Sequence, residues 1–143
     1  MAIRPFRKQD RAAVLGLLGE ARAIDSPNHR LHVAEEDGGV VGVALWRQPD
    51  SGDEAFLGSV VVTQPNRWDL LYGLVAAAVR DALARGVRTG SLTLSDERLL
   101  AKVQRDFPFQ PTPSAWEPNT GRPLEWEIRA DLADALRALE RVT

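Results

Sequence analysis

The sequence predicts an α/β fold of the α+β kind, in which helices flank a mixed and mostly antiparallel sheet. The first observation behind this prediction lies in residues 55–94, where an apolar run is followed by a long helical pattern and a second short apolar run. That order is typical of a βαβ unit, whose two strands run parallel through a right-handed crossover. The second observation is an Asp-Gly pair between two strand-like runs in residues 31–47, which indicates an antiparallel hairpin.

The N-terminal part of the chain reads as a short strand, a helix and the hairpin. Asp10 is placed as the N-cap of a helix over residues 11–23, because the apolar residues that follow it share one helical face. The hairpin strands are expected over residues 31–36 and 40–47. His32 alternates with apolar neighbours in the first of them, so we expect its side chain to point toward solvent or the rim of the sheet.

The central part of the chain carries the predicted βαβ unit. A strand is expected over residues 55–63, and its run Val60-Val61-Val62 is typical of a strand buried on both faces. Apolar residues at three- and four-residue spacing predict a helix over residues 67–85, which Gly86 ends. Residues 91–94 form the second strand. The free N–H groups that open the helix lie at the carboxyl end of the first strand, so this corner is a candidate anion site.

The C-terminal part is expected to add a helix, two strands and a last helix. Ser95 is a candidate cap for a helix over residues 96–105. Pro113 confines the next strand to an edge or a bulged course. Residues 124–129 alternate with the period of a strand, and the final amphipathic helix begins near Asp131.

Length and composition exclude several classes of protein. The 143 residues predict one domain, 1–143, and the composition of 44% hydrophobic and 27% charged residues is that of a globular protein. The formal net charge of −2 argues against a nucleic-acid binder. Cysteine is absent, and the two histidines have no adjacent ligand cluster, so we expect no metal site. No apolar run is long enough for a membrane span, and no signal peptide is visible, so we expect a soluble cytoplasmic protein.

Taken in order, these segments resemble the GCN5-related N-acetyltransferase (GNAT) superfamily. The strings that carry the resemblance are IRPFRKQDRAAVLGLL, HVAEEDGGVVGVALW, VVVTQPNRWDLLYGL with ALARGVRTGSLTL, and EPNTGRPLEWEIRADL. The resemblance implies a GNAT-type acyl-CoA N-acyltransferase fold whose fourth and fifth strands splay apart. It also implies transfer of an acetyl group from acetyl-coenzyme A to a primary amine of a small molecule or peptide. Acetyltransferase-type domains often pair, which suggests a homodimer through the last helix and the strand near Leu124 to Ile128.

The resemblance also implies where the coenzyme lies. The pantetheine would follow the backbone of Val61, Val62 and Thr63, and the diphosphate would rest on the turn and first helical residues Arg67, Trp68, Asp69, Leu70, Leu71 and Gly73. This turn departs from the family, which usually has Arg or Gln followed by glycines that let backbone N–H groups approach the diphosphate. Only Gly73 meets the small-residue pattern, and Asp69 brings a carboxylate close to the phosphates. Arg67 is either a phosphate ligand or a solvated side chain, and Trp68 either stacks on a ligand or plugs the pocket.

The catalytic groups are the least marked part of the sequence. An ammonium substrate must lose a proton before it attacks, and a carboxylate can accept that proton directly or through water. Glu54, at the start of the cleft strand, is the first candidate and Asp96 the second. Many family members carry a tyrosine as general acid where this chain has Gln104, and the single tyrosine, Tyr72, is expected to pack in the long helix. These departures leave a second hypothesis open, namely a catalytically degenerate GNAT fold that serves as a binding or interaction module.

Overall fold

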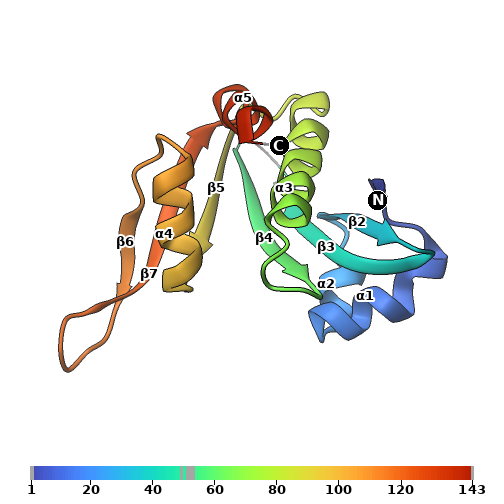
Figure 1. The fold of residues 1–143 in the computed structure, drawn as a ribbon, viewed down its shortest axis with the longest axis horizontal. Coiled ribbons are helices and arrows are strands. Elements are labelled where there is room, and N and C mark those ends of the chain that lie inside the picture. The colour runs from blue at the N-terminus through green and yellow to red at the C-terminus, as the bar shows by residue number, and fades with distance from the viewer. Residues whose placement is uncertain (1, 49, 51–53, 143) are drawn as a thin grey trace.

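A computed structural model describes residues 2–48, 50 and 54–142 of the chain and shows a seven-stranded sheet with helices on both faces (Figure 1). The strands are β1 (Ala2–Pro5), β2 (His29–Glu36), β3 (Gly39–Arg47), β4 (Glu54–Val62), β5 (Thr89–Leu94), β6 (Thr112–Trp116) and β7 (Pro123–Asp131). The helices are η1 (Lys8–Asp10), α1 (Arg11–Leu18), α2 (Ala21–Asp25), α3 (Trp68–Ala84), α4 (Glu97–Asp106) and α5 (Leu132–Val142).

The sheet confirms the predicted fold class. Its strand order is β1-β2-β3-β4-β5-β7-β6. The neighbours β4 and β5 run parallel, and the other neighbouring pairs among the described strands run antiparallel. The βαβ unit of the sequence is β4-α3-β5, and it joins an antiparallel N-terminal half to an antiparallel C-terminal half. This junction is therefore the one place where the sheet changes its pairing mode within the described residues.

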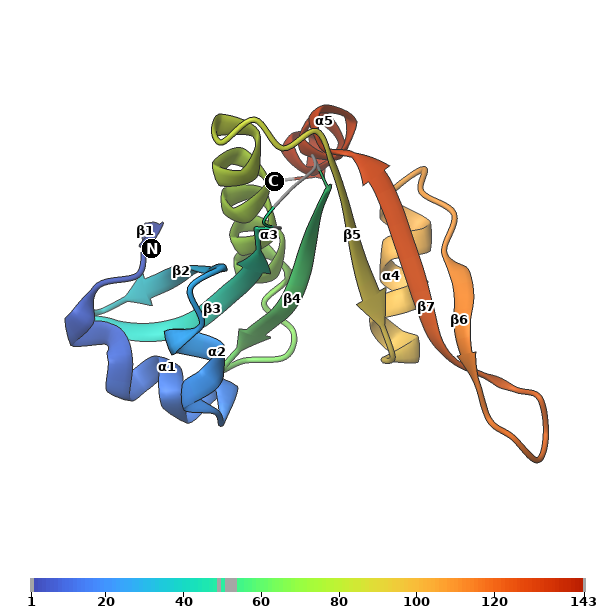
Figure 2. The same ribbon diagram turned by 180° about the vertical axis from the view of Figure 1, so that it is seen from behind.

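Strands β4 and β5 pair only at their N-terminal ends. Their register runs from Glu54 opposite Thr89 to Leu57 opposite Leu92, although β4 continues to Val62. Beyond that point the two strands diverge, as both views of the ribbon show (Figures 1 and 2). In the register with β3, Leu45 lies opposite Ser59 and Trp46 lies opposite Leu57, so Gly58 has no partner residue. A bulge of this kind bends its strand, which explains why β4 turns away from β5 here.

Helices α3, α4 and α5 cover one face of the sheet, and α1 and α2 cover the other. On the first face, α3 packs on β2 and β3 through Leu70 and Leu74, which are fully buried with Ala34 and Ala44. The same face of β5 and β7 holds α4 and α5, in a core that includes Tyr72, Leu100 and Leu139 among others. On the second face, α1 packs on β2 and β3 through Val14. Helices α3, α4 and α5 thus cover the part of the sheet where β4 and β5 diverge.

The hairpin and the edge strand follow the sequence-based prediction. Asp37 and Gly38 both adopt positive φ angles, of 52° and 80°, as a two-residue turn between twisted strands requires. Strand β6 lies at the edge of the sheet, and its register with β7 is irregular between Pro113 and Ala115. Proline cannot donate to a strand ladder, so the edge position is where the sheet tolerates it.

Two local predictions were wrong, and a third was correct in position only. The single helix expected over residues 11–23 is divided into α1 and α2, because Gly19 adopts a left-handed conformation with φ of 79° and ends α1. Asp10 holds the predicted N-cap position of α1, but its side chain makes no capping bond, because its carboxylate accepts from the N–H of Arg7 at 2.8 Å and from the guanidinium of Arg4 at 2.7 Å. The cap of α4 is Asp96 and not Ser95, because Asp96 accepts from the N–H of Arg98 at 2.8 Å.

His32 was also predicted wrongly, because it is buried with only 8% of its surface exposed. It lies in β2 between β1 and β3, opposite Pro5 and Ala44, and its Nε2 is 3.9 Å from Asp81 of α3. Alternation along β2 correctly places the His32 side chain on the other face of the sheet from Leu31 and Val33. It did not indicate that the long helix α3 would cover that face.

Candidate functional site

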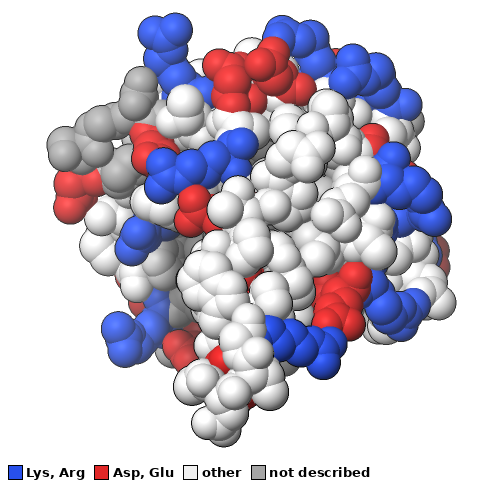
Figure 3. Space-filling model, turned by 90° about the vertical axis from the view of Figure 1, so that its left-hand side faces the viewer, with Lys and Arg blue, Asp and Glu red and all other residues white. Residues whose placement is uncertain are grey.

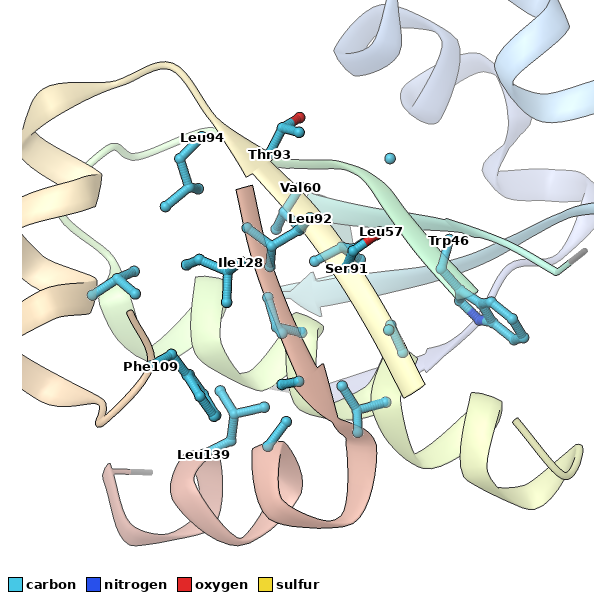
Figure 4. Close-up of a pocket in the computed structure, with 18 of the residues that line it drawn as sticks. Trp46, Leu57, Val60, Ser91, Leu92, Thr93, Leu94, Phe109, Ile128 and Leu139 are labelled. Atoms are coloured by element: carbon cyan, nitrogen blue, oxygen red, sulfur yellow. The ribbon is translucent and has the colours of Figure 1, made fainter. Parts of the chain in front are cut away.

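A cavity of about 290 Å³ lies where β4 and β5 separate. Side chains from β4, β5, β7 and the helices that cover these strands face this space, most of them aliphatic or aromatic (Figure 4). Its walls include Leu57, Gly58, Ser59 and Val60 of β4, Ser91, Leu92, Thr93 and Leu94 of β5, Leu71, Tyr72, Val75 and Val79 of α3, and Phe109, Ile128 and Leu139. Ser95 and Asp96 line it beyond the C-terminal end of β5. The site is therefore an apolar cleft with polar groups at its open end.

The backbone of β4 supplies the polar side of this cleft. The N–H of Thr63 donates to the carbonyl of Val41 at 2.9 Å, so Thr63 faces β3. Successive residues of a strand direct their backbone groups to opposite edges, so Val62 and Val60 direct theirs toward the β5 side. No described strand pairs with β4 on that side beyond Leu57. An extended ligand with amide groups fits this edge, because buried backbone donors and acceptors require partners.

The turn between β4 and α3, residues 63–67, is held together by Arg67. The guanidinium donates to both carboxylate oxygens of Glu36, at 3.0 and 2.7 Å, and to both of Asp69, each at 3.0 Å. Hydrogen bonds from Arg67 are the main reason why the pKa values of Glu36 and Asp69 lie below their usual ranges. The same two carboxylates raise the pKa of Arg67. The positive charge of Arg67 is therefore already paired with two carboxylates of the protein itself.

The carboxylate of Asp69 belongs to the first turn of α3, where the helix begins with free backbone N–H groups. Besides Arg67, the backbone N–H groups of Leu70 and of Asp69 itself lower the pKa of the Asp69 carboxyl. A carboxylate in the first turn of a helix is stabilised by the free donors and the helix dipole. The helix start that the sequence predicts as an anion site therefore carries a carboxylate of this protein in its first turn, and its use by a ligand stays a prediction.

A cluster of four side chains joins α3 to α4 beside the cavity. The Tyr72 hydroxyl donates to Asp106 at 2.9 Å, and the Lys102 ammonium lies 2.6 Å from the same carboxylate. Lys102 also lies over the ring of Trp68, 5.6 Å from its centroid. Burial, with a further contribution from Asp106, raises the pKa of Tyr72, so its phenol stays protonated. The expected packing role of Tyr72 agrees with its 4% exposure.

The structure brings few of the predicted coenzyme-binding side chains to the cavity. Leu71 lines it, whereas Val61, Val62, Thr63, Arg67, Trp68 and Asp69 are not among its lining residues. Leu70 is fully buried against β2 and β3. Gly73 lies on the β1 side of α3, where an added Cβ would come within 2.6 Å of Ile3 Cδ1. Its small size therefore serves the packing of α3 on β1.

The two predicted general bases lie at opposite ends of the splayed strands. Glu54 begins β4 where β4 and β5 are still paired, and its carboxylate is 3.5 Å from the guanidinium of Arg129. Asp96 lines the cavity at the open end and caps α4 through the N–H groups of Arg98 and Leu99. Their catalytic roles stay predictions.

Sequence reasoning missed two features of the site. Gly58 interrupts an otherwise apolar strand pattern, and a glycine in that position is itself a signal for a bulge. Lys102 and Asp106 are four residues apart on a predicted helix, which indicates an ion pair on one helix face. Their contact with Tyr72 joins residues 34 positions apart in sequence, and no local pattern predicts it.

Within residues 2–48, 50 and 54–142, no group of three or more His, Cys, Asp or Glu side chains is placed to hold a metal ion. None of the helices built from these residues combines the length and apolar character needed to cross a bilayer.

Comparison with known proteins identifies the architecture. No protein-family model matches the sequence, and no curated protein matches it significantly. Among solved structures, the ribosomal-protein-S18-alanine N-acetyltransferase of Escherichia coli has 16% sequence identity and a TM-score of 0.69, over 92% of this chain and 93% of that chain. The chain has the GNAT fold. That conclusion agrees with the order of elements and with the divergence of β4 from β5.

The names of two further GNAT-fold neighbours include a substrate or a bound ligand. A spermidine N-acetyltransferase chimera from Vibrio cholerae and hSSAT has 13% identity and a TM-score of 0.69, over 95% of this chain and 99% of that chain. A GNAT family acetyltransferase from Elizabethkingia anophelis with acetyl-CoA bound has 13% identity and a TM-score of 0.66, over 91% of this chain and 97% of that chain. At these identities the likeness establishes the GNAT fold of this chain.

Proposed function

We propose that this GNAT-fold protein is an N-acyltransferase that moves an acyl group from a coenzyme A thioester to a primary amine. The observation that carries the proposal is the cleft between β4 and β5, which has an unpaired β4 edge on one side and apolar walls around it. Acetyl-coenzyme A is the reference donor, because acetyl-CoA is bound in one structural neighbour. The pantetheine amides of the donor pair with the free backbone groups of Val60 and Val62.

The reaction needs little covalent chemistry from the protein. The amine nitrogen attacks the thioester carbonyl, an N–C bond forms and the C–S bond breaks, and the products are an amide and the free thiol of coenzyme A. One proton leaves the attacking nitrogen and one joins the departing thiolate. Gly58, which has no partner in the β3 register, supplies the candidate N–H for the carbonyl oxygen as it gains negative charge.

The acceptor is proposed to be an amine on a small molecule or peptide. Named substrates of the neighbours, spermidine in one and a ribosomal-protein alanine in another, are amines of these two kinds. Asp96 lines the cavity and is proposed to take the ammonium proton through water, with Glu54 as the other candidate. On the side of the molecule that carries β6 and α4, acidic and basic side chains lie side by side around an uncharged band (Figure 3). That mixture does not favour nucleic acid as a partner of this face, and the formal net charge of −2 does not favour it for the whole chain. A homodimer stays a prediction.

A second candidate function is a binding module with the same fold and no acyl transfer. The observation that favours it is the start of α3, where Asp69 places a carboxylate in the first turn and Arg67 is engaged by Glu36 and Asp69. In this alternative the cleft holds a ligand without a diphosphate.

Titration calorimetry with acetyl-CoA, followed by a thiol-release assay with spermidine and an N-terminal alanine peptide, separates the two candidates. Micromolar binding and amine-dependent release of coenzyme A are expected for the transferase. Binding of acetyl-CoA without release of coenzyme A, whichever amine is added, supports the binding module. No heat and no thermal shift at millimolar acetyl-CoA would contradict the proposed transferase.

A further inference from the structure

The two halves of a coenzyme A thioester would meet different parts of the candidate site. The acyl-pantetheine half is uncharged and carries amide groups, whereas the nucleotide half carries the phosphates. In the placement that the GNAT resemblance implies, the first half lies along β4 in the cleft, and the second lies over the turn at residues 63–67 and the start of α3. The chain offers very different contacts to these two halves.

The cleft offers free groups to the pantetheine half. Within the described residues, β4 has no strand partner on the β5 side beyond Leu57, although it continues to Val62. Its backbone N–H and C=O groups there require partners. Leu71 and Val75 of α3 and Leu99 of α4 line the same space, and apolar walls stabilise the methyl and methylene groups of the arm. Both kinds of contact are therefore available to an uncharged arm.

The guanidinium of Arg67, in contrast, has no donor left for a phosphate. It carries five N–H donors, and they make five hydrogen bonds within the chain: two to Glu36, at 3.0 and 2.7 Å, two to Asp69, each at 3.0 Å, and one to Gln64 at 3.3 Å. The network combines two carboxylates with one guanidinium, so it carries one negative charge before any ligand binds. A diphosphate would add more negative charge and would have to displace these bonds.

The first residues of α3 are bulky or acidic. Trp68, Asp69 and Leu70 all carry side chains, so none lets a ligand approach its backbone N–H as closely as a glycine would. The ring of Trp68 packs against that of Tyr72, with 6.2 Å between the centroids, and the ammonium of Lys102 lies 5.6 Å from the Trp68 centroid. Asp69 adds its carboxylate in the same turn. The start of α3 therefore combines bulk with negative charge where the nucleotide half would lie.

We infer that this protein recognises its donor through the acyl-pantetheine arm, and that the diphosphate and nucleotide add no affinity. The donor class is thus an acyl-pantetheine thioester, whether or not a nucleotide is attached to it. The inference rests on the proposed acyl transfer and assigns donor specificity to the cleft between β4 and β5. The amine attacks the same thioester carbonyl and the C–S bond breaks, while one proton leaves the nitrogen and one joins the pantetheine thiolate.

Calorimetry on the full chain with acetyl-CoA, acetyl-phosphopantetheine and acetyl-pantetheine tests the inference. Each phosphorylated donor is expected to bind no more than about fivefold tighter than acetyl-pantetheine, the range of an exposed charge pair. A larger advantage of either phosphorylated donor overturns the inference and leaves the proposed transferase standing. Absence of binding by all three thioesters overturns both.

A double variant tests whether the paired turn is the cause. Glu36→Gln with Asp69→Asn removes both carboxylates that hold Arg67 and is expected to give acetyl-CoA an advantage over acetyl-pantetheine of about tenfold or more, as hydrogen bonds to a charged group do. Asp134→Asn with Glu140→Gln removes two exposed charges from α5 and should keep the original affinity ratio. An unchanged ratio in the folded Glu36→Gln/Asp69→Asn protein, judged by its melting curve, overturns the role assigned to the turn. If that protein does not fold, Asp69→Asn alone replaces it, with the same ratio as readout.

Arg98 of α4 also reaches the turn, and its guanidinium donates to the side-chain oxygen of Asn66 at 3.4 Å. The Arg98 side chain is exposed, so a contact from it to a phosphate would be screened by water. Arg98→Ala is therefore expected to leave the ratio of acetyl-CoA to acetyl-pantetheine affinity unchanged. A fall in that ratio would assign the diphosphate to Arg98 and overturn the inference.

Discussion

The two ends of the candidate site differ in whether their charged and hydrogen-bonding groups are already paired within the protein. In the cleft, β4 beyond Leu57 has a free edge and the walls enclose about 290 Å³. At the turn, Arg67 is bound by Glu36 and Asp69, and Asp69 places its carboxylate in the first turn of α3. One end is open to an extended apolar ligand, and the other already holds a carboxylate where an anionic ligand would lie. In this GNAT fold the cleft between β4 and β5 is therefore open, whereas the turn proposed for the diphosphate already has its charged groups paired.

The largest expected effect tests whether the turn is fixed by the core. Leu70 stands in the first turn of α3 and is fully buried against β2 and β3. Leu70→Ala should lower the free energy of unfolding by about 2–5 kcal/mol, because it leaves a cavity in a packed core. Urea denaturation measures this change. Leu124→Ala, at a leucine that is 49% exposed, is the control and should change stability by less than about 0.5 kcal/mol. Equal effects of the two variants would show that the turn is not held by its burial.

A smaller effect tests whether Asp69 occupies the anion corner. Asp69→Asn removes the negative charge at the start of α3 and keeps the size of the side chain. Binding of acetyl-CoA should tighten by about twofold to fivefold, the range of a charge at a helix N-terminus, and the gain should shrink at high salt. Calorimetry at two salt concentrations measures it, with Asp134→Asn on the exposed surface of α5 as the control. Weaker binding by Asp69→Asn would mean that the carboxylate assists the ligand.

The smallest effect concerns the wall behind the cavity. The indole N–H of Trp46, which lines the cavity, donates to Asp81 at 3.0 Å, and Asp81 lies beside His32 and Arg85. Burial lowers the pKa of His32 from its ordinary 6.5, with Arg85 acting in the same direction and Asp81 opposing. The folded protein therefore binds this proton less readily than the unfolded chain, so stability is full above about pH 6.5 and falls as the pH drops through the lowered value.

Melting curves between pH 7.5 and 5 check this prediction. His32→Gln should flatten the loss of stability across that interval, since the titrating group is gone. His29→Gln offers the matched control, because His29 lies at the start of the same strand. An equally steep loss in His32→Gln and in the unmodified protein would assign the pH dependence to other groups.

The sequence carried enough information for the fold because its signals there are local. The Asp37-Gly38 turn, the apolar stripe of α3 and the alternation in β7 each depend on residues close together, and each element is present. The site depends on register between distant strands. Glu54 reads as the start of the cleft strand, but its position opposite Thr89 sets it at the closed end.

The turn illustrates the same limit at the level of one side chain. Asn66 to Leu71 show in sequence that glycines are missing, which is why Arg67 and Trp68 were each given two interpretations. The pairing of Arg67 with Glu36 joins residues 31 positions apart, and it depends on where the β2–β3 hairpin ends. Periodicity gives the face of an element, and only the packed structure gives the partner.

The central claim is that a thioester lies along the free edge of β4, and amide NMR with acetyl-CoA tests it most directly. Backbone N–H signals of Gly58, Val60 and Val62 are expected to shift with ligand concentration, together with that of Leu71. The signal of Ala34, buried in β2, is expected to stay in place. Saturating acetyl-CoA that leaves the β4 amides unmoved, or that shifts only residues outside the cleft, would contradict the account.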